Sequence, residues 1–111
     1  MKVQILLLFM LITCCISCNE IDFSEGAPKC LKEKVREWKK FGCKDLSVDE
    51  YAFQNSTVFL LNASRCCCDF GSAVVDNECI QLGVIGGYDG NQTINGEDFS
   101  NAVYVRTIWD R

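Results

Sequence analysis

Residues 28–42 read PKCLKEKVREWKKFG, and this stretch sets the expected fold class. Leu31, Val35 and Trp38 recur at steps of four and three residues, as on one face of an α-helix, while charged side chains fill the other face. Pro28 suits the first turn of a helix, and Gly42 suits its C-terminal end. The pattern predicts an amphipathic helix over about residues 29–41.

The sequence after this helix is typical of short strands. Residues 57–61, TVFLL, are apolar and β-branched between polar flanks, and residues 102–109, AVYVRTIW, form a second run of this kind. Residues 73–75 and 79–82 flank a predicted tight hairpin turn. The glycines between residues 83 and 96 predict mainly loops and turns.

These elements together predict a small disulfide-rich α+β fold, in which one N-terminal amphipathic helix packs on a short antiparallel β-sheet. A chain of this length has few large apolar residues with which to fill its interior. We therefore expect the largest ones to form the core: Trp38, Phe59, Tyr104, Ile108 and Trp109.

The N-terminal residues predict an export signal. Lys2 precedes an unbroken apolar run over residues 5–12, which is shorter than the roughly 20 residues needed to cross a bilayer. We expect residues 1–18 to be a cleaved signal peptide and residues 19–111 to be a single secreted domain with no membrane span. Cleavage after Ser17 satisfies the small-residue rule better but retains Cys18. Lipoprotein-type modification of Cys18 is a competing interpretation.

The cysteines predict a covalent framework. The chain has nine, and removal of residues 1–18 leaves an even number that can pair completely. We expect three intramolecular disulfides, with the helix clamped to the sheet through Cys30 or Cys43. The run at residues 66–68 is the expected hub because its side chains alternate between two faces, while Cys79 could close the local hairpin. The connectivity stays open among Cys30, Cys43, Cys66, Cys67, Cys68 and Cys79.

Three N-x-[ST] sequons predict N-glycosylation, at Asn55, Asn62 and Asn91. Each lies beside an expected strand end or loop. Glycans would cover these surfaces, so we expect a partner to dock elsewhere.

Composition excludes several classes of function. A chain with 11 basic and 15 acidic residues, and a formal charge of −4, is a poor ligand for nucleic acid or anionic membrane. The absence of histidine removes triad and histidine–metal chemistry, and three adjacent cysteines cannot all face one zinc ion. The acid pairs Asp49-Glu50 and Glu97-Asp98 are interpreted as solvated, and the glycine-rich residues 83–87 as a turn-rich connection. We assign no catalytic, cofactor-binding or metal-binding residue and expect no enzyme.

The C-terminal part of the chain, residues 66–110, resembles the extracellular N-terminal domain of methuselah-type G-protein-coupled receptors. Similar order is found in a paired-cysteine strand, a turn, a further cysteine, a glycosylatable N-x-T and an F-x-N segment. The resemblance implies an all-β-leaning extracellular domain that binds peptide or protein ligands, and it supplies no catalytic residues. The positions concerned are Cys67-Cys68-Asp69-Phe70-Gly71, Val75-Asp76-Asn77, Cys79, Asn91-Gln92-Thr93, Gly96, Phe99, Asn101, Val105 and Asp110.

The expected function is that of a secreted, glycosylated interaction module that binds an extracellular protein or peptide, as a soluble relative of a receptor ectodomain. The alternative is a small secreted effector, such as a protease inhibitor or host-defence peptide. An inhibitor needs an exposed loop braced by cysteine, and residues 62–65, ending at Arg65 beside Cys66, are the candidate. The sequon at Asn62 argues against it because a glycan would obstruct a protease cleft.

Overall fold

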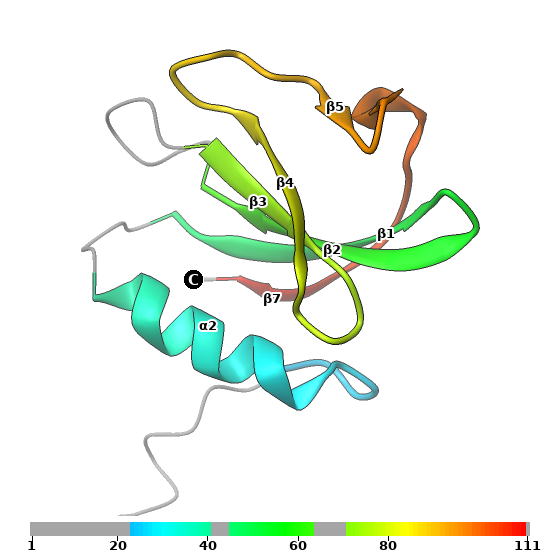
Figure 1. Ribbon diagram of the computed structural model, residues 1–111. Coiled ribbons are helices and arrows are strands. Elements are labelled where there is room, and N and C mark those ends of the chain that lie inside the picture. Colours follow the sequence, from blue (N-terminus) through cyan, green and yellow to red (C-terminus); the bar gives the residue numbers. More distant parts are fainter. Residues whose placement is uncertain (1–22, 41–44, 64–70, 111) are drawn as a thin grey trace, which may run out of the picture.

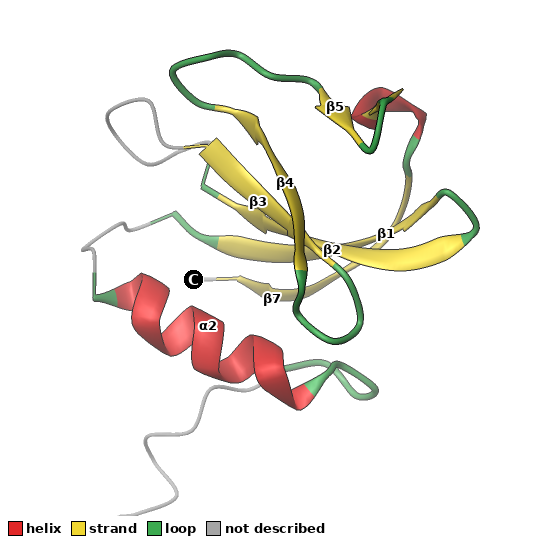
Figure 2. Cartoon of the chain, in the orientation of Figure 1, coloured by secondary structure: helices red, strands yellow, loops and turns green. Residues whose placement is uncertain are grey.

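The computed structural model describes residues 23–40, 45–63 and 71–110 (Figures 1 and 2). Within these ranges, one α-helix precedes the strands and a single 3₁₀ turn comes before the last strand. The elements are α2 (Lys29–Lys39), β1 (Ser47–Phe53), β2 (Ser56–Asn62), β3 (Gly71–Val75), β4 (Gln81–Gly86), β5 (Thr93–Ile94), β6 (Glu97–Asp98), η2 (Phe99–Asn101) and β7 (Val103–Asp110).

Five strands form one antiparallel sheet in the order β4-β3-β2-β1-β7. β1 and β2 are joined by a two-residue turn, since Phe53 pairs with Ser56. Gln54 and Asn55 both have positive φ angles, of 52° and 59°, as a type I′ hairpin turn requires. The last strand, β7, returns across the molecule to pair with β1, so it forms one edge of the sheet.

Both faces of the sheet are covered, as the central strand β2 shows. Four successive β2 residues, at positions 58–61, are buried. Side chains of a strand alternate between faces. Phe59 and Leu61 accordingly join the core cluster that contains Leu31 and Val35 of α2, while Val58 and Leu60 join a second cluster with Ile94 and Phe99.

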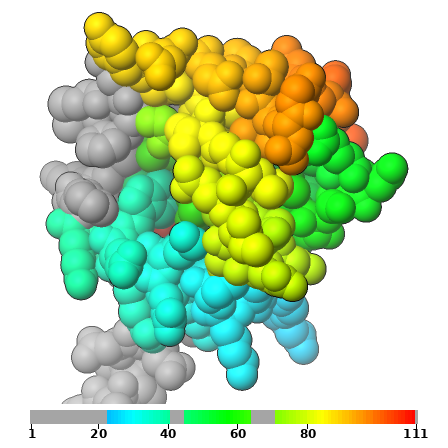
Figure 3. Space-filling view, viewed as in Figure 1, coloured from blue at the N-terminus to red at the C-terminus, as the bar shows by residue number. Residues whose placement is uncertain are grey.

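The second cluster lies under the short β5–β6 hairpin and η2, which follow β4 and cross above the sheet in Figure 1. The hairpin turns at Asn95 and Gly96, which both have positive φ angles. Gly83 of β4 permits its close approach, because a Cβ there would lie 2.7 Å from Cδ1 of Ile94. In the space-filling view, β4 and the residues after it form the near face, with α2 below them (Figure 3).

The expected α+β, disulfide-rich class is wrong. Of the described residues, 49% are in strands and 18% are helical, so the protein is mainly an antiparallel β-structure with a single short helix. One disulfide is present in the described ranges, Cys30–Cys79. The sequence underestimates strand content for a physical reason. Charges within residues 47–53 and glycines within residues 83–96 are unfavourable in an isolated strand, but these segments form strands because neighbouring strands pair with them.

Several local predictions are confirmed. The helix expected near residues 29–41 is α2, and the expected strands at residues 57–61 and 102–109 are β2 and β7. The expected strands at residues 73–75 and 79–82 pair as β3 and β4, but β4 begins at Gln81, so the connection covers residues 76–80 and is longer than the tight turn expected. The glycine-rich residues 83–86 are strand rather than connection, and β1 was not expected at all. Among the expected core residues Phe59 and Ile108 are buried and both tryptophans pack against them, but Tyr104 is exposed.

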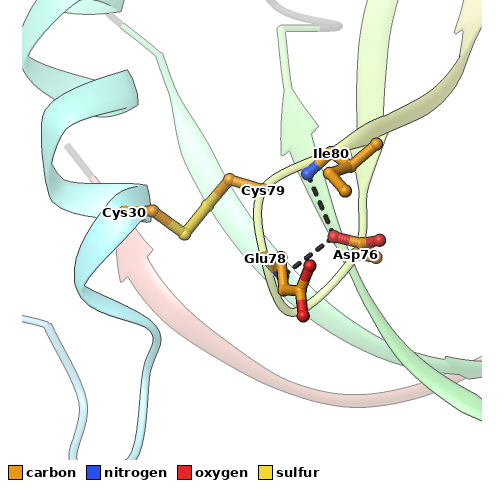
Figure 4. The surroundings of a disulfide bond; sticks show 5 residues. All are labelled: Cys30, Asp76, Glu78, Cys79 and Ile80. Atoms are coloured by element: carbon orange, nitrogen blue, oxygen red, sulfur yellow. Dashed lines mark hydrogen bonds between the residues drawn. A yellow bond between two sulfur atoms is a disulfide. The ribbon is translucent and has the colours of Figure 1, made fainter.

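The disulfide clamps α2 to the loop between β3 and β4 (Figure 4). This loop is also held by Asp76, whose Oδ1 accepts hydrogen bonds from the backbone N–H groups of Glu78 at 2.8 Å and Ile80 at 3.0 Å. The sequence predicts a clamp through Cys30 or Cys43, and Cys30 forms it. The expectation that Cys79 closes the local hairpin is wrong. The partner of Cys30 is Cys79 and not a member of the 66–68 run, because the β3–β4 pairing carries Cys79 to the first turn of the helix.

Candidate functional site

The β7 strand presents three consecutive large apolar side chains to solvent. Val103 is 64% exposed, Tyr104 is 54% exposed and Val105 is 51% exposed. We call these three residues the β7 edge patch. In an edge strand the outer backbone N–H and C=O groups have no strand partner, and natural edges usually combine this with charge or proline. The charged residues of β7, Arg106 and Asp110, follow this patch in the strand, so in the described part of the chain apolar surface and an open edge coincide over residues 103–105.

Two irregularities in the β1–β7 pairing shape this edge. Glu50 pairs with Arg106 and Tyr51 pairs with Tyr104, so Val105 is an extra residue that has no pairing partner in β1. A bulge of this kind re-aims the side chains beside it. In a regular strand residues 104 and 107 would face opposite ways, but here the hydroxyls of Tyr104 and Thr107 lie 2.7 Å apart.

These hydroxyls continue to a buried carboxylate. Thr107 Oγ1 donates to Asp49 Oδ1 at 2.7 Å, and Asp49 is only 7% exposed. Ser47 Oγ and Asn62 Nδ2 lie at 3.4 and 3.5 Å from Asp49 Oδ2, as longer hydrogen bonds. The interpretation of Asp49 as a solvated acid is therefore wrong, because β2 and β7 enclose it from both sides.

The direction of the hydrogen bonds follows from the chemistry of the groups. An ionised carboxylate only accepts, so the Thr107 proton is directed to Asp49. Thr107 Oγ1 must then accept a hydrogen bond from the Tyr104 hydroxyl, which leaves the lone pairs of the Tyr104 oxygen free for an outside donor. Hydrogen bonds in such a chain polarise one another, which strengthens the Tyr104 oxygen as an acceptor.

An aromatic cluster supports this chain from the side. The ring of Tyr51 lies 5.8 Å from the Tyr104 ring, nearly edge-on, and 5.2 Å from the Phe99 ring. Burial raises the pKa of the Tyr51 phenol, and the negative charge of Asp49 and the neighbouring Tyr104 raise it further. Tyr51 therefore stays neutral and fixes the ring of Tyr104 in place.

Charge is divided unequally between the helix and the sheet. Residues 29–40 carry six cationic side chains, Lys29, Lys32, Lys34, Arg36, Lys39 and Lys40. The described residues from 45 onward carry one, Arg106, whose Nε donates to Glu50 Oε1 at 3.2 Å. The same ranges hold nine carboxylates: Asp45, Asp49, Glu50, Asp76, Glu78, Asp89, Glu97, Asp98 and Asp110.

Two hollows adjoin these elements. A pocket of about 190 Å³ between α2 and the sheet is lined by Trp38, Leu61 and Ala73, and it is smaller than typical small-molecule sites of about 300–1,000 Å³. A shallow depression of about 570 Å³ runs along the second half of β7, from Thr107 to Asp110, beside Phe23 of the N-terminal arm. This depression lies on the same strand as the β7 edge patch, towards the C-terminal end of β7.

The three sequons differ in how their amides are used. Asn55 is exposed at the tip of the β1–β2 turn. The Asn62 amide belongs to the Asp49 cluster. Asn91 Nδ2 donates to the carbonyls of Val84 at 2.8 Å and Thr93 at 2.9 Å, so this amide supports the loop after β4.

Other predicted site residues lie outside the described ranges: the signal peptide, Cys43, Cys66, Cys67, Cys68 and Arg65. Among the described residues there is no group of three or more Cys, Asp or Glu side chains placed to hold a metal ion. None of the helices in those ranges has the length and apolar character to cross a membrane.

Sequence reasoning missed the roles of Asp49 and Thr107. The signal available for this surface was the run of residues 103–105 within a predicted strand.

Fold and site define a small, mainly antiparallel β-protein whose apolar edge strand is backed by a chain of hydroxyls leading to a buried carboxylate. The chain belongs to a family described as a domain of unknown function, DUF6970, whose model matches residues 34–111. No curated protein and no solved structure matches it.

Proposed function

We propose that the protein is an exported interaction module that binds a protein or peptide partner through the β7 edge patch. The observation that carries this proposal is the run of three exposed apolar residues, Val103 to Val105, on an open strand edge. Exposed consecutive apolar residues are unfavourable for solubility unless they serve binding. Peptide recognition at a free sheet edge uses main-chain hydrogen bonds for affinity and side chains for selectivity.

A peptide library displayed on phage tests this proposal. We expect enriched peptides that bind the wild-type protein but not the Val103→Ser/Val105→Ser variant, which removes apolar surface without adding charge. Ile80→Ser is the matched control, because Ile80 is also apolar and 57% exposed but lies in the β3–β4 loop. Circular dichroism verifies that both variants fold. Peptides that bind wild type and edge variant equally would contradict the proposal.

Export, disulfide bonding and glycosylation form the second part of the proposal. With Cys30 and Cys79 paired, the four remaining cysteines of residues 19–111 form two further bonds, giving three in all. Asn55 is the sequon best suited to carry a glycan, since modification of Asn91 would cost its hydrogen bonds to the backbone. The suggested relationship to receptor ectodomains remains a prediction from residues 66–110.

The intact mass of exported protein, measured before and after deglycosylation and reduction, tests this second part. We expect the loss of residues 1–18, a gain of six protons on reduction, and a glycan on the peptide containing Asn55. An acyl-bearing Cys18 at the mature N-terminus would show instead that the protein is anchored by lipid. A chain that retains residues 1–18 would overturn export.

A further inference from the structure

We infer that the β7 edge patch binds a short extended segment that carries a lysine or arginine, with its cationic group against Tyr104. This inference rests on the proposed function and specifies the chemistry of the partner.

The open part of the edge has a definite extent. At its C-terminal half the arm already uses the outer side of β7, because the Ser24 N–H donates to the Ile108 carbonyl at 3.0 Å, and the Phe23 ring lies 6.2 Å from that of Trp109. The arm also lies beside residues 106 and 107, since Phe23 and Ser24 share a hollow with Thr107 and a Cβ on Gly26 would lie 3.6 Å from a terminal nitrogen of Arg106. Among the described residues, the part of the edge that the arm leaves open is therefore residues 103–105. The bulge at Val105 limits regular pairing, so a segment of a few residues fits this edge better than a long strand.

Tyr104 provides two interactions for a cation. Its ring is exposed and held by Tyr51, and a lysine or arginine over such a ring is attracted to the negative π-face. Its hydroxyl donates to Thr107, whose own hydroxyl donates to Asp49, so the lone pairs of the Tyr104 oxygen remain available as acceptors. Ammonium and guanidinium groups only donate, which matches this oxygen.

The charges around the edge select the same partner. The sheet half of the molecule is rich in carboxylates, and Arg106, its single described cation, is already paired with Glu50. Like charges across an interface are unfavourable, so an acidic segment is rejected.

Three synthetic ten-residue peptides test the inference, in which valine alternates with lysine, glutamate or serine. Binding is measured by fluorescence anisotropy at low and high salt. We expect the lysine peptide to bind at least about tenfold more tightly than the serine peptide at low salt, with the advantage lost at about 1 M salt, where charges are screened beyond about 3 Å. The glutamate peptide should bind more weakly than either.

Variants locate the interaction. Tyr104→Ala should weaken binding of the lysine peptide by about two- to fivefold or more through loss of the cation–π contact. Tyr104→Phe keeps the ring and should lie between that variant and wild type. Tyr88→Ala is the matched control, since Tyr88 is 89% exposed in the loop after β4, and it should bind as wild type does.

The outcomes separate this inference from the proposed function. Equal affinity for all three peptides, or lysine-peptide binding unaffected by Tyr104→Ala, overturns the cationic partner even if library peptides still require Val103 and Val105. A dimer in sedimentation experiments that Val103→Ser/Val105→Ser dissociates would show that a second copy occupies the edge, and also overturns the inference.

Discussion

Removal of the Cys30–Cys79 disulfide should cost a large part of the stability of this protein. The bond closes a loop with a sequence separation of 49 residues. In the chain-entropy model, a loop of that size restricts the unfolded chain by about 14 cal/mol/K, or about 4 kcal/mol at 25 °C. Small domains have unfolding free energies starting at about 5 kcal/mol, so the Cys30→Ser/Cys79→Ser variant should be barely folded.

Urea unfolding followed by tryptophan fluorescence measures this loss. With a slope of about 1 kcal/mol/M for a domain of this size, the midpoint should fall by roughly 3–4 M. Ile80→Ala is a suitable control because its side chain is exposed beside the disulfide, and it should change stability by less than about 0.5 kcal/mol. Peptide mapping without reductant establishes that the remaining cysteines pair as in wild type.

A second variant separates the covalent bond from the local backbone. Cys79 has a φ angle of +61°, which costs a residue with a side chain about 1 kcal/mol more than glycine. Cys30→Ser/Cys79→Gly should therefore be about 1 kcal/mol more stable than Cys30→Ser/Cys79→Ser. A serine double variant that unfolds within 1 M urea of wild type would refute the loop-closure reasoning.

Three further predictions concern the core and the Asp49 cluster. Leu31→Ala should reduce the unfolding free energy by about 2–5 kcal/mol in urea, because Leu31 is completely buried between α2 and the sheet. Thr107→Val should cost about 1–3 kcal/mol in the same assay by removing the closest hydrogen-bond donor to buried Asp49, whereas Thr107→Ser, which keeps the hydroxyl, should cost less. The pKa of Tyr51 is raised in the folded protein, so its contribution to the unfolding free energy is fully present below pH 10 and is lost as pH rises through the folded-state pKa. In urea unfolding at a series of alkaline pH values, the unfolding free energy of Tyr51→Phe should therefore fall less steeply with pH than that of wild type. Equal slopes for the two proteins would contradict this.

The sequence alone determined α2, β2 and β7, because the residues within each element are sufficient to define it. The apolar spacing of Leu31, Val35 and Trp38 defines the helix because only a helical period brings these side chains to one face. The β-branched and apolar residues of β2 and β7 define strands for the same kind of local reason. The sequence also narrowed the helix clamp to Cys30 or Cys43, which flank the helix, and Cys30 forms it with the β3–β4 loop.

Tertiary structure decided the features that depend on pairing between distant segments, namely β1, the partner of Cys30 and the bulge in β7. β1 carries Asp49 and Glu50 in its centre and becomes a strand because β2 and β7 pair on both sides of it, which also encloses Asp49. The β3–β4 pairing fixes the partner of Cys30, and a bulge in the β1–β7 pairing brings the hydroxyls of Tyr104 and Thr107 together. Register, bulges and edge position arise from the pairing of residues distant in the chain, so the candidate binding surface became visible only in the folded protein.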